Sequence, residues 1–279
     1  VFNDAAREKF EKAWGVSLPG KPGLTVTEIM NAVEEGKVRG LYIMGENPMM
    51  SDPDLNHVEK ALKNCELLIV QDIFLTETAK LADVVLPGAT FAEKDGTFTN
   101  TERRVQRIRK AIKPVGQSRA DFEILSDVMA ALGYENSFHT AEEVFAEMAT
   151  VTPSYGGMSY GRLEQLGSLQ WPCPTADHPG TPILHVGKFS RGERALFKPA
   201  PYRPSAETPD SEYPMIFTTG RILYHYHTST MTGRVEGLMN ISGRSYVEVN
   251  PADAAKLGIL PGDSVKVSSR RGGVIAEAR

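Results

Sequence analysis

Residues 66–87 read ELLIVQDIFLTETAKLADVVLP, and this stretch decides the fold. The apolar run 66–70 predicts one strand and the run 83–86 predicts a second, with a short helix over 76–81 between them. Short apolar runs bounded by polar residues are typical of buried strands. A strand, a connecting helix and another strand at this spacing predict a βαβ unit and a parallel sheet.

The same alternation occurs upstream of this stretch. Thr25 and Glu28 have capping-box spacing at the start of a helix predicted over 24–36, and residues 40–44 form an apolar run that predicts a strand. A further helix is predicted over 55–62. Because parallel strands end along one edge, ligands of such sheets bind there.

The second half of the chain differs in composition and in the elements that it predicts. Two further helices are predicted, one with Asp121 as its N-cap and one with a capping box at Thr140 and Glu143. Residues 153–214 are rich in Pro and Gly, which predicts an ordered connector that lies over a surface. Four strands are then expected at Met215–Thr219, Ser245–Asn250, Ser264–Ser268 and Gly273–Ala278, with a helix over Pro251–Leu257. The sequence therefore predicts a Rossmann-like α/β parallel-sheet domain over 1–179 and an incomplete β-barrel-like domain over 180–279.

Composition excludes several function classes. The 279 residues are 41% apolar and 24% charged with a net charge of −4, so no broad field attracts nucleic acid or anionic membrane. No run is long enough for a membrane span. Cys65 and Cys173 lie far apart, which predicts neither a disulfide framework nor a cysteine metal site and fits a reducing cytoplasm. The chain starts at Val1 and stops inside a strand pattern, so we expect a piece of a longer polypeptide.

Polar residues that follow the predicted strands are the first candidates for a ligand site. Asn47 lies in Gly-Glu-Asn-Pro after the strand at 40–44, and Gln71-Asp72 closes the next strand. A carboxylate at this edge suits the N–H donors of a guanine, whereas the Lys94 ammonium suits a pyrophosphate. Each residue also has a plain structural interpretation: Asn47 and Asp72 in turns, Lys94 in solvent, and Asp121 as a helix cap.

A second polar group occupies Thr218–Thr228, which reads TTGRILYHYHT. Its hydroxyls, the flexible Gly220, the Arg221 guanidinium and two imidazoles can enclose phosphates or a pterin. A metal site at His225 and His227, or a purely structural loop, are the alternatives. The basic run 103–110 is poorly spaced for an amphipathic helix, and we expect either a solvated strand or a cationic wall near an anionic cofactor.

These segments, with EKDGTFTNTERR at 93–104, VQDIF at 70–74, ADVVLP at 82–87 and QWPC at 170–173, resemble the molybdopterin oxidoreductase family, and within it the catalytic alpha subunit of molybdenum or tungsten formate dehydrogenase. The resemblance covers nearly the whole chain. It implies a double-psi type barrel for the second domain. It also implies that the cofactor is bound by matching positions, namely Asn47, Gln71, Asp72, Lys94, Asp121, Thr219, Gly220, Arg221, His225, His227 and Thr228.

The resemblance further implies a C-terminal fragment without catalytic or metal-ligating residues of its own. Two molybdopterin guanine dinucleotides with Mo or W would serve the full subunit, and a 4Fe-4S cluster would belong to the missing N-terminal part. The implied reaction converts formate to CO2, with electrons leaving through iron–sulfur or diaphorase-type partner subunits. The alternatives are another enzyme of the family such as a nitrate reductase, a cofactor-free structural homologue in a respiratory complex, and a nucleotide-binding domain without catalysis.

Overall fold

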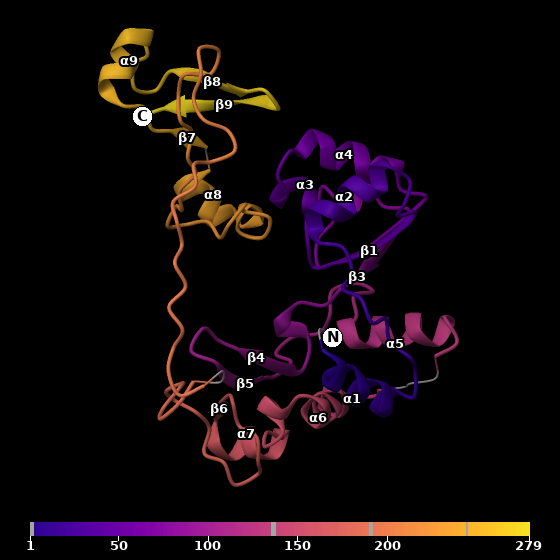
Figure 1. Ribbon diagram of the computed structural model, residues 1–279. Coiled ribbons are helices and arrows are strands. Elements are labelled where there is room, and N and C mark those ends of the chain that lie inside the picture. The colour runs from indigo at the N-terminus through magenta and orange to yellow at the C-terminus, as the bar shows by residue number, and fades with distance from the viewer. Residues whose placement is uncertain (1–2, 135–137, 190–191, 244) are drawn as a thin grey trace. The chain divides into compact units, whose positions relative to one another are not determined.

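The computed structural model describes residues 3–134, 138–189, 192–243 and 245–279 (Figure 1). Its contacts divide the chain into two compact units. Unit 1 consists of residues 1–29, 69–74 and 84–198, and unit 2 consists of residues 30–68, 75–83 and 199–279.

A three-stranded sheet has the order β1-β2-β3, formed by β1 (Gly40–Met44), β2 (Leu67–Asp72) and β3 (Val84–Pro87). Strands β2 and β3 are parallel, with Asp72 opposite Pro87. The predicted parallel sheet is therefore confirmed, and the predicted strand limits are correct to within two residues. Because the pairing is parallel, the chain ends of β2 and β3 lie at the same edge.

Helices α2 (Val26–Glu34) and α4 (Leu55–Asn64) each present one apolar stripe. Met30 and Val33 of α2 are buried, as are Val58 and Leu62 of α4, which is the pattern expected for helices that cover a core. Helix α3 (Pro48–Ser51) is a single turn that begins with proline. The helix expected over 76–81 is only a 3-10 turn, η1 (Ala79–Leu81).

Unit 1 contains an antiparallel sheet that the sequence patterns did not predict. It has the order β4-β5-β6, formed by β4 (Gly96–Thr99), β5 (Arg104–Ile108) and β6 (Ser168–Gln170). The basic run therefore forms a strand, one of the two structures expected for it. Its arginines are not simply solvated, because the Arg107 guanidinium lies 3.4 Å from the centroid of the Tyr160 ring and pairs with Glu164 at 2.9 Å.

The core of unit 1 corrects the prediction that residues 153–214 are only a surface connector. Their first part forms η3 (Pro153–Tyr155), α7 (Tyr160–Leu166) and β6. These elements pack with α6 (Ala141–Val151), and the buried cluster includes Phe145, Met158, Leu163, Leu169 and Cys173. The Pro and Gly content misled the prediction because the apolar residues of this stretch are spaced irregularly and become buried only through partners distant in sequence.

Helix α5 (Asp121–Ala131) begins one residue earlier than the predicted N-cap at Asp121 implies. Ala120 is the N-cap, and Asp121 is the first helical residue, so the predicted cap at Asp121 is wrong. The predicted capping box of Thr140 and Glu143 is confirmed at the start of α6. Helix α1 (Asp4–Trp14) is held to α6 by a hydrogen bond of 2.8 Å from Trp14 Nε1 to Glu147.

The last third of the chain contains η4 (Thr232–Arg234), α8 (Glu236–Ser242), β7 (Tyr246–Val247), α9 (Pro251–Leu257), β8 (Ser264–Ser269) and β9 (Gly272–Ala278). Its strands form one sheet in the order β7-β9-β8, in which β8 and β9 are an antiparallel hairpin. The predicted hairpin strands and α9 are confirmed, whereas the strand expected at 245–250 is only two residues long. The double-psi barrel stays a prediction.

The strand expected at Met215–Thr219 is not formed. Its apolar residues Ile216 and Phe217 are 81% and 61% exposed. A strand requires a neighbouring backbone for its N–H and C=O groups, and among the described residues none pairs with this segment. An apolar run alone is therefore insufficient for a strand here.

Candidate functional site

A polar cluster of three sequence-predicted residues lies in unit 1, near the carboxyl end of β2. Gln71, near the end of β2, is fully buried and donates from Nε2 to Asp121 Oδ1 at 2.7 Å. The Lys94 ammonium, in the loop before β4, donates to Asp121 Oδ2. The carboxylate of Asp121, the first residue of α5, thus contacts both a strand end and a loop lysine. Gln71 precedes it by 50 residues and Lys94 by 27.

Gly88 brings Asp72 close to this cluster. Its N–H donates to the Asp72 carbonyl at 3.0 Å, and a Cβ at position 88 would lie 3.2 Å from Asp121 Oδ1 and 3.6 Å from the Asp72 carbonyl carbon. The glycine therefore lets the α5 carboxylate approach the end of β2. The Asp72 carboxylate itself accepts from the Phe74 N–H at 2.9 Å, as the turn interpretation predicts.

The cluster combines hydrogen-bond donors with one carboxylate. An ammonium has three donors, and the Lys94 side chain, 23% exposed, uses one of them on Asp121. The N-terminus of α5 adds backbone N–H groups and the positive end of a helix dipole. The cluster thus offers donors for phosphate oxygens beside a carboxylate that accepts N–H donors.

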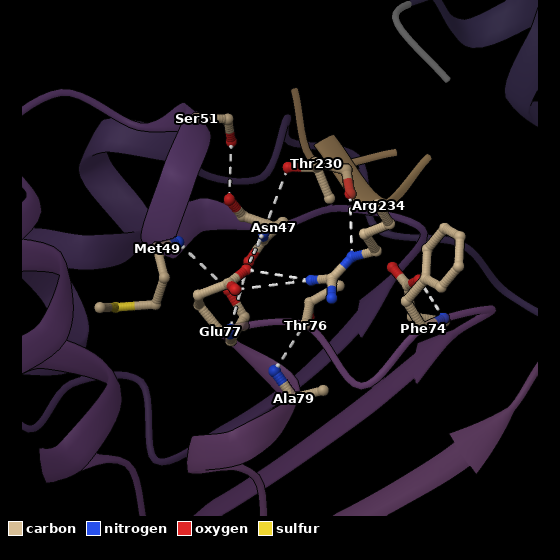
Figure 2. A network of polar contacts seen from close by, with 11 residues as sticks. Asn47, Met49, Ser51, Phe74, Thr76, Glu77, Ala79, Thr230 and Arg234 are labelled. Carbon is tan, nitrogen blue, oxygen red and sulfur yellow. Dashed lines mark hydrogen bonds and ion pairs between the residues drawn. The ribbon is translucent and has the colours of Figure 1, made fainter. Parts of the chain in front are cut away.

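A second network, in unit 2, surrounds Asn47 (Figure 2). The Asn47 side chain is 3% exposed, and its Oδ1 accepts from the Thr78 hydroxyl at 2.7 Å and from the Thr78 N–H at 3.2 Å. Its Nδ2 donates to Glu77 Oε2 at 2.9 Å and to Thr230 Oγ1 at 3.2 Å. A carboxamide has two donors and two acceptor positions, so all four are used within the chain.

Glu77 is the charged member of the second network. It pairs with Arg234 at 3.3 Å, and the hydrogen bond from Asn47 is the main reason that the pKa of the Glu77 carboxyl lies below its usual value. The Arg234 Nε also donates to the Thr230 carbonyl at 3.0 Å. The network therefore connects the exit of β1 with residues more than 150 positions later.

The loop predicted to contact a cofactor, residues 219–228, is also in unit 2 and is largely exposed. Thr219, Gly220, Arg221, His227 and Thr228 are all exposed, and within the described part of the chain Arg221 has no hydrogen bond or ion pair. His227 adopts a left-handed backbone conformation with φ of 49°. The loop thus presents a guanidinium and hydroxyls toward solvent.

His225 is the exception in this loop. Its Nδ1 lies 3.0 Å from Thr232 Oγ1, and its Nε2 lies 2.5 Å from the Ser242 carbonyl oxygen. Because a carbonyl only accepts, Nε2 carries a proton, and in the neutral ring Nδ1 then accepts from the threonine hydroxyl. Both ring nitrogens are engaged, which favours an anchoring role over metal ligation. Within the described residues no group of three His, Cys, Asp or Glu side chains is arranged to hold a metal ion.

Sequence reasoning missed Glu77, Thr78, Thr230, Arg234 and Gly88. The pair Glu77-Thr78 lies five positions after the predicted edge residues Gln71-Asp72, so its position beyond the end of a strand was an available signal. Gly88 follows the third strand in the same way. For Thr230 and Arg234 the sequence carries no local signal, because their role depends on contacts with a distant segment. None of the described helices is long and apolar enough to cross a bilayer.

A parallel sheet with polar residues gathered at its carboxyl edge is typical of the α/β proteins that bind ligands at that edge. Residues 3–131 match the family model described as molybdopterin oxidoreductase, and residues 215–279 match the one described as Molydopterin dinucleotide binding domain. The chain belongs to the molybdopterin oxidoreductase family.

Several curated relatives match nearly the whole chain. The F420-dependent formate dehydrogenase subunit alpha of Methanocaldococcus jannaschii is 52% identical over 97% of this chain, and formate dehydrogenase H of Escherichia coli is 38% identical over 100%. The assimilatory nitrate reductase catalytic subunit of Bacillus subtilis is 36% identical over 100%. The chain spans about 40% of the length of these relatives.

A solved structure supports the fold. Acetylene hydratase from Pelobacter acetylenicus superposes with a TM-score of 0.66 over 99% of this chain and 40% of that chain, at 20% sequence identity. The arrangement of elements is therefore shared with an enzyme whose sequence has diverged widely.

Proposed function

We propose that this chain is the C-terminal cofactor-binding part of a formate dehydrogenase catalytic subunit that carries Mo or W on two molybdopterin guanine dinucleotides. The observation that supports this proposal best is the cluster of Gln71, Lys94 and Asp121 beside Gly88 at the sheet edge. The names of the relatives that are 50–52% identical, all F420-dependent formate dehydrogenases, support formate as the substrate.

The residues fit the group in chemical terms. Lys94 would hold pyrophosphate oxygens, while Asp72 and Asp121 would accept hydrogen bonds from a guanine, with Gln71 fixing the Asp121 carboxylate. Arg221 would hold oxygen atoms of the pterin moiety together with the hydroxyls of Thr219 and Thr228. These donors surround an anionic ligand without contributing a metal ligand, which agrees with a role in binding and orientation.

When bound, the metal cofactor supplies the two-electron acceptor for oxidation of formate to CO2 and one proton. We place the metal ligand from the protein and a 4Fe-4S cluster in the remainder of the subunit. Electrons would pass through iron–sulfur or diaphorase-type subunits, and the names of the three most similar of these relatives support F420 as the final acceptor. Residues 1–279 alone are expected to have no formate-oxidising activity.

The test measures binding of guanosine diphosphate to the purified chain by calorimetry. Lys94→Met removes one charged donor, which lowers the affinity roughly 10- to 150-fold. Lys63→Met is the matched control, since Lys63 is an exposed lysine whose partner, Glu59, lies one helical turn away. Thermal unfolding of both variants verifies that the fold is retained. If the wild-type chain does not bind the nucleotide, or if Lys94→Met binds it equally well, the proposed site is wrong.

A nitrate reductase is the second candidate, because a nitrate reductase subunit is 36% identical over the whole chain. The fold does not determine the substrate. The holoenzyme that contains this chain should reduce a dye in the presence of formate, and it should not oxidise a reduced dye with nitrate. The opposite pattern would assign it to the nitrate reductases.

A further inference from the structure

The network around Glu77 joins two segments that are far apart in sequence (Figure 2). Glu77 Oε2 lies 2.9 Å from Asn47 Nδ2 and 3.3 Å from Arg234 Nη2. Asn47 follows β1, whereas Arg234 ends the η4 turn, which begins four residues after loop 219–228. A single carboxylate therefore contacts both segments that carry candidate cofactor-binding residues within unit 2.

We propose that Glu77 is a positioning residue of the cofactor site, which fixes the orientation of the Asn47 carboxamide and anchors the turn at 230–234 that holds loop 219–228 in place. The identity of the ligand rests on the proposed function given above. The network itself does not depend on the proposed function, because it consists of contacts within the chain.

The first part of the proposal follows from the polarity of the partners of Asn47. The Thr78 N–H can only donate, and the Glu77 carboxylate can only accept. A flipped carboxamide would place its NH2 group against the Thr78 N–H and its oxygen against the Glu77 carboxylate, and both contacts are repulsive. Asn47 is therefore held in one orientation, with its oxygen toward Thr78 and its NH2 group toward Glu77 and Thr230.

The second part follows from the contacts between residues 225 and 234. The Gly233 N–H donates to the Ser229 carbonyl at 2.8 Å, Arg234 Nε donates to the Thr230 carbonyl at 3.0 Å, and His225 contacts Thr232. These bonds make the stretch one folded piece, and the ion pair of Arg234 with Glu77 connects that piece to the segment around Asn47. Asn47, which donates to this carboxylate, is buried, and its other partner Thr78 is fully buried.

The network also specifies how a ligand can reach Asn47. All four hydrogen-bonding positions of its carboxamide are filled, so a ligand that bonds to it has to replace a partner. Of the two partners of Nδ2, Thr230 is replaced at less cost than Glu77, because its hydroxyl is neutral and its bond, at 3.2 Å, is longer than the 2.9 Å bond to Glu77. Glu77 keeps the carboxamide aligned during such an exchange.

Hydrogen exchange measured on the purified chain tests the network. Glu77→Gln and Arg234→Met should each accelerate exchange of the Gly233 amide roughly 10-fold, the factor for loss of about 1.4 kcal/mol. The double variant should be at most threefold faster than either single variant, because both changes remove the same contact. Glu66→Gln is the matched control, since in the described part of the chain Glu66 forms its ion pair with the exposed Arg39, at 2.7 Å, and the substitution should leave Gly233 unchanged.

A second measurement separates positioning from structural support. In the holoenzyme, Glu77→Gln should lower the pterin content per chain at least fivefold, with a Tm of the chain within the range of the Glu66→Gln control. Exchange rates within twofold of wild type, multiplicative effects in the double variant, or a normal pterin content would each overturn the proposal. A wild-type holoenzyme without pterin would contradict the proposed function instead, and the exchange rates would still decide whether Glu77 anchors the turn.

Discussion

The substitution Gly157→Ala tests the packing of unit 1 most severely. A Cβ at position 157 would lie 1.9 Å from the Thr175 carbonyl oxygen and 2.9 Å from the Cys173 carbonyl oxygen. Both obstacles are backbone atoms, so no side-chain rotation relieves the overlap. To reach the 3.0 Å that Cβ contacts require, the two segments would have to separate by about 1.1 Å.

The cost follows from what this separation breaks. The Gly157 N–H donates to the Cys173 carbonyl at 2.7 Å, and loss of a buried backbone bond costs about 1–3 kcal/mol. Cys173 is fully buried in the core cluster, and forced movement within a packed core costs a further ~1–3 kcal/mol. We therefore expect a loss of about 2–6 kcal/mol in the free energy of unfolding, a large part of the 5–15 kcal/mol typical of a domain.

Urea unfolding followed by tryptophan fluorescence measures this loss. Both tryptophans, Trp14 and Trp171, belong to unit 1, so the signal reports on that unit. Gly161→Ala is the matched control: it lies within α7, its nearest atom would be 4.0 Å away, and alanine should stabilise the helix by up to ~1 kcal/mol. If Gly157→Ala unfolds at the same urea concentration as Gly161→Ala, the close approach of residues 157 and 175 is wrong.

Two further predictions concern the polar groups of unit 2. The pKa of the Glu77 carboxyl is lowered in the folded chain, so its stabilising effect is fully present above the unfolded pKa near 4.5 and is lost as the pH falls through the lower folded value. Acid titration of Glu77→Gln, monitored by circular dichroism, should lack this part of the pH dependence. A titration curve identical to that of the wild type would contradict the prediction. Arg221→Ala should change the stability of the chain by less than ~0.5 kcal/mol, because Arg221 is exposed. In the holoenzyme the same variant should weaken pterin retention by roughly 1.5–3 kcal/mol, and Arg221→Lys should recover part of it. Full pterin retention in the alanine variant would show that Arg221 does not hold the cofactor.

The parallel sheet could be predicted because its information is local. Each strand is a short apolar run that ends in polar residues, and the intervening helices have clear apolar stripes. The same logic placed Gln71 and Asp72 at the sheet edge. The pairing of Asp121 with Gln71 and Lys94 could be anticipated only from the family resemblance, because Asp121 is 50 positions after Gln71.

The antiparallel sheet of unit 1 could not be predicted by the same means. Strand β6 is only three residues long, and it pairs with β5 across more than 50 intervening residues. Its pairing is decided by burial of Leu169 against Val105 rather than by propensity. The failed prediction at 215–219 has the converse cause, since apolar residues there lack a backbone partner in the described structure.

The pairing of Lys94 with Asp121 bears on which ligand the edge cluster selects. The carboxylate cancels much of the field of the ammonium at long range, so a bare phosphate gains little from approaching the site. At contact distance the two groups act independently, because the Asp121 carboxylate accepts hydrogen bonds from N–H groups and the Lys94 ammonium donates to oxygen atoms. A ligand that combines both features, a base with N–H donors joined to phosphates, compensates both charges at once. Gln71 adds to this selectivity because its bond to Asp121 Oδ1 keeps the carboxylate oriented when Lys94 is drawn toward a phosphate. These charges are complementary to a guanine nucleotide moiety rather than to a simple anion, which supports the proposal that the cluster binds part of a molybdopterin guanine dinucleotide.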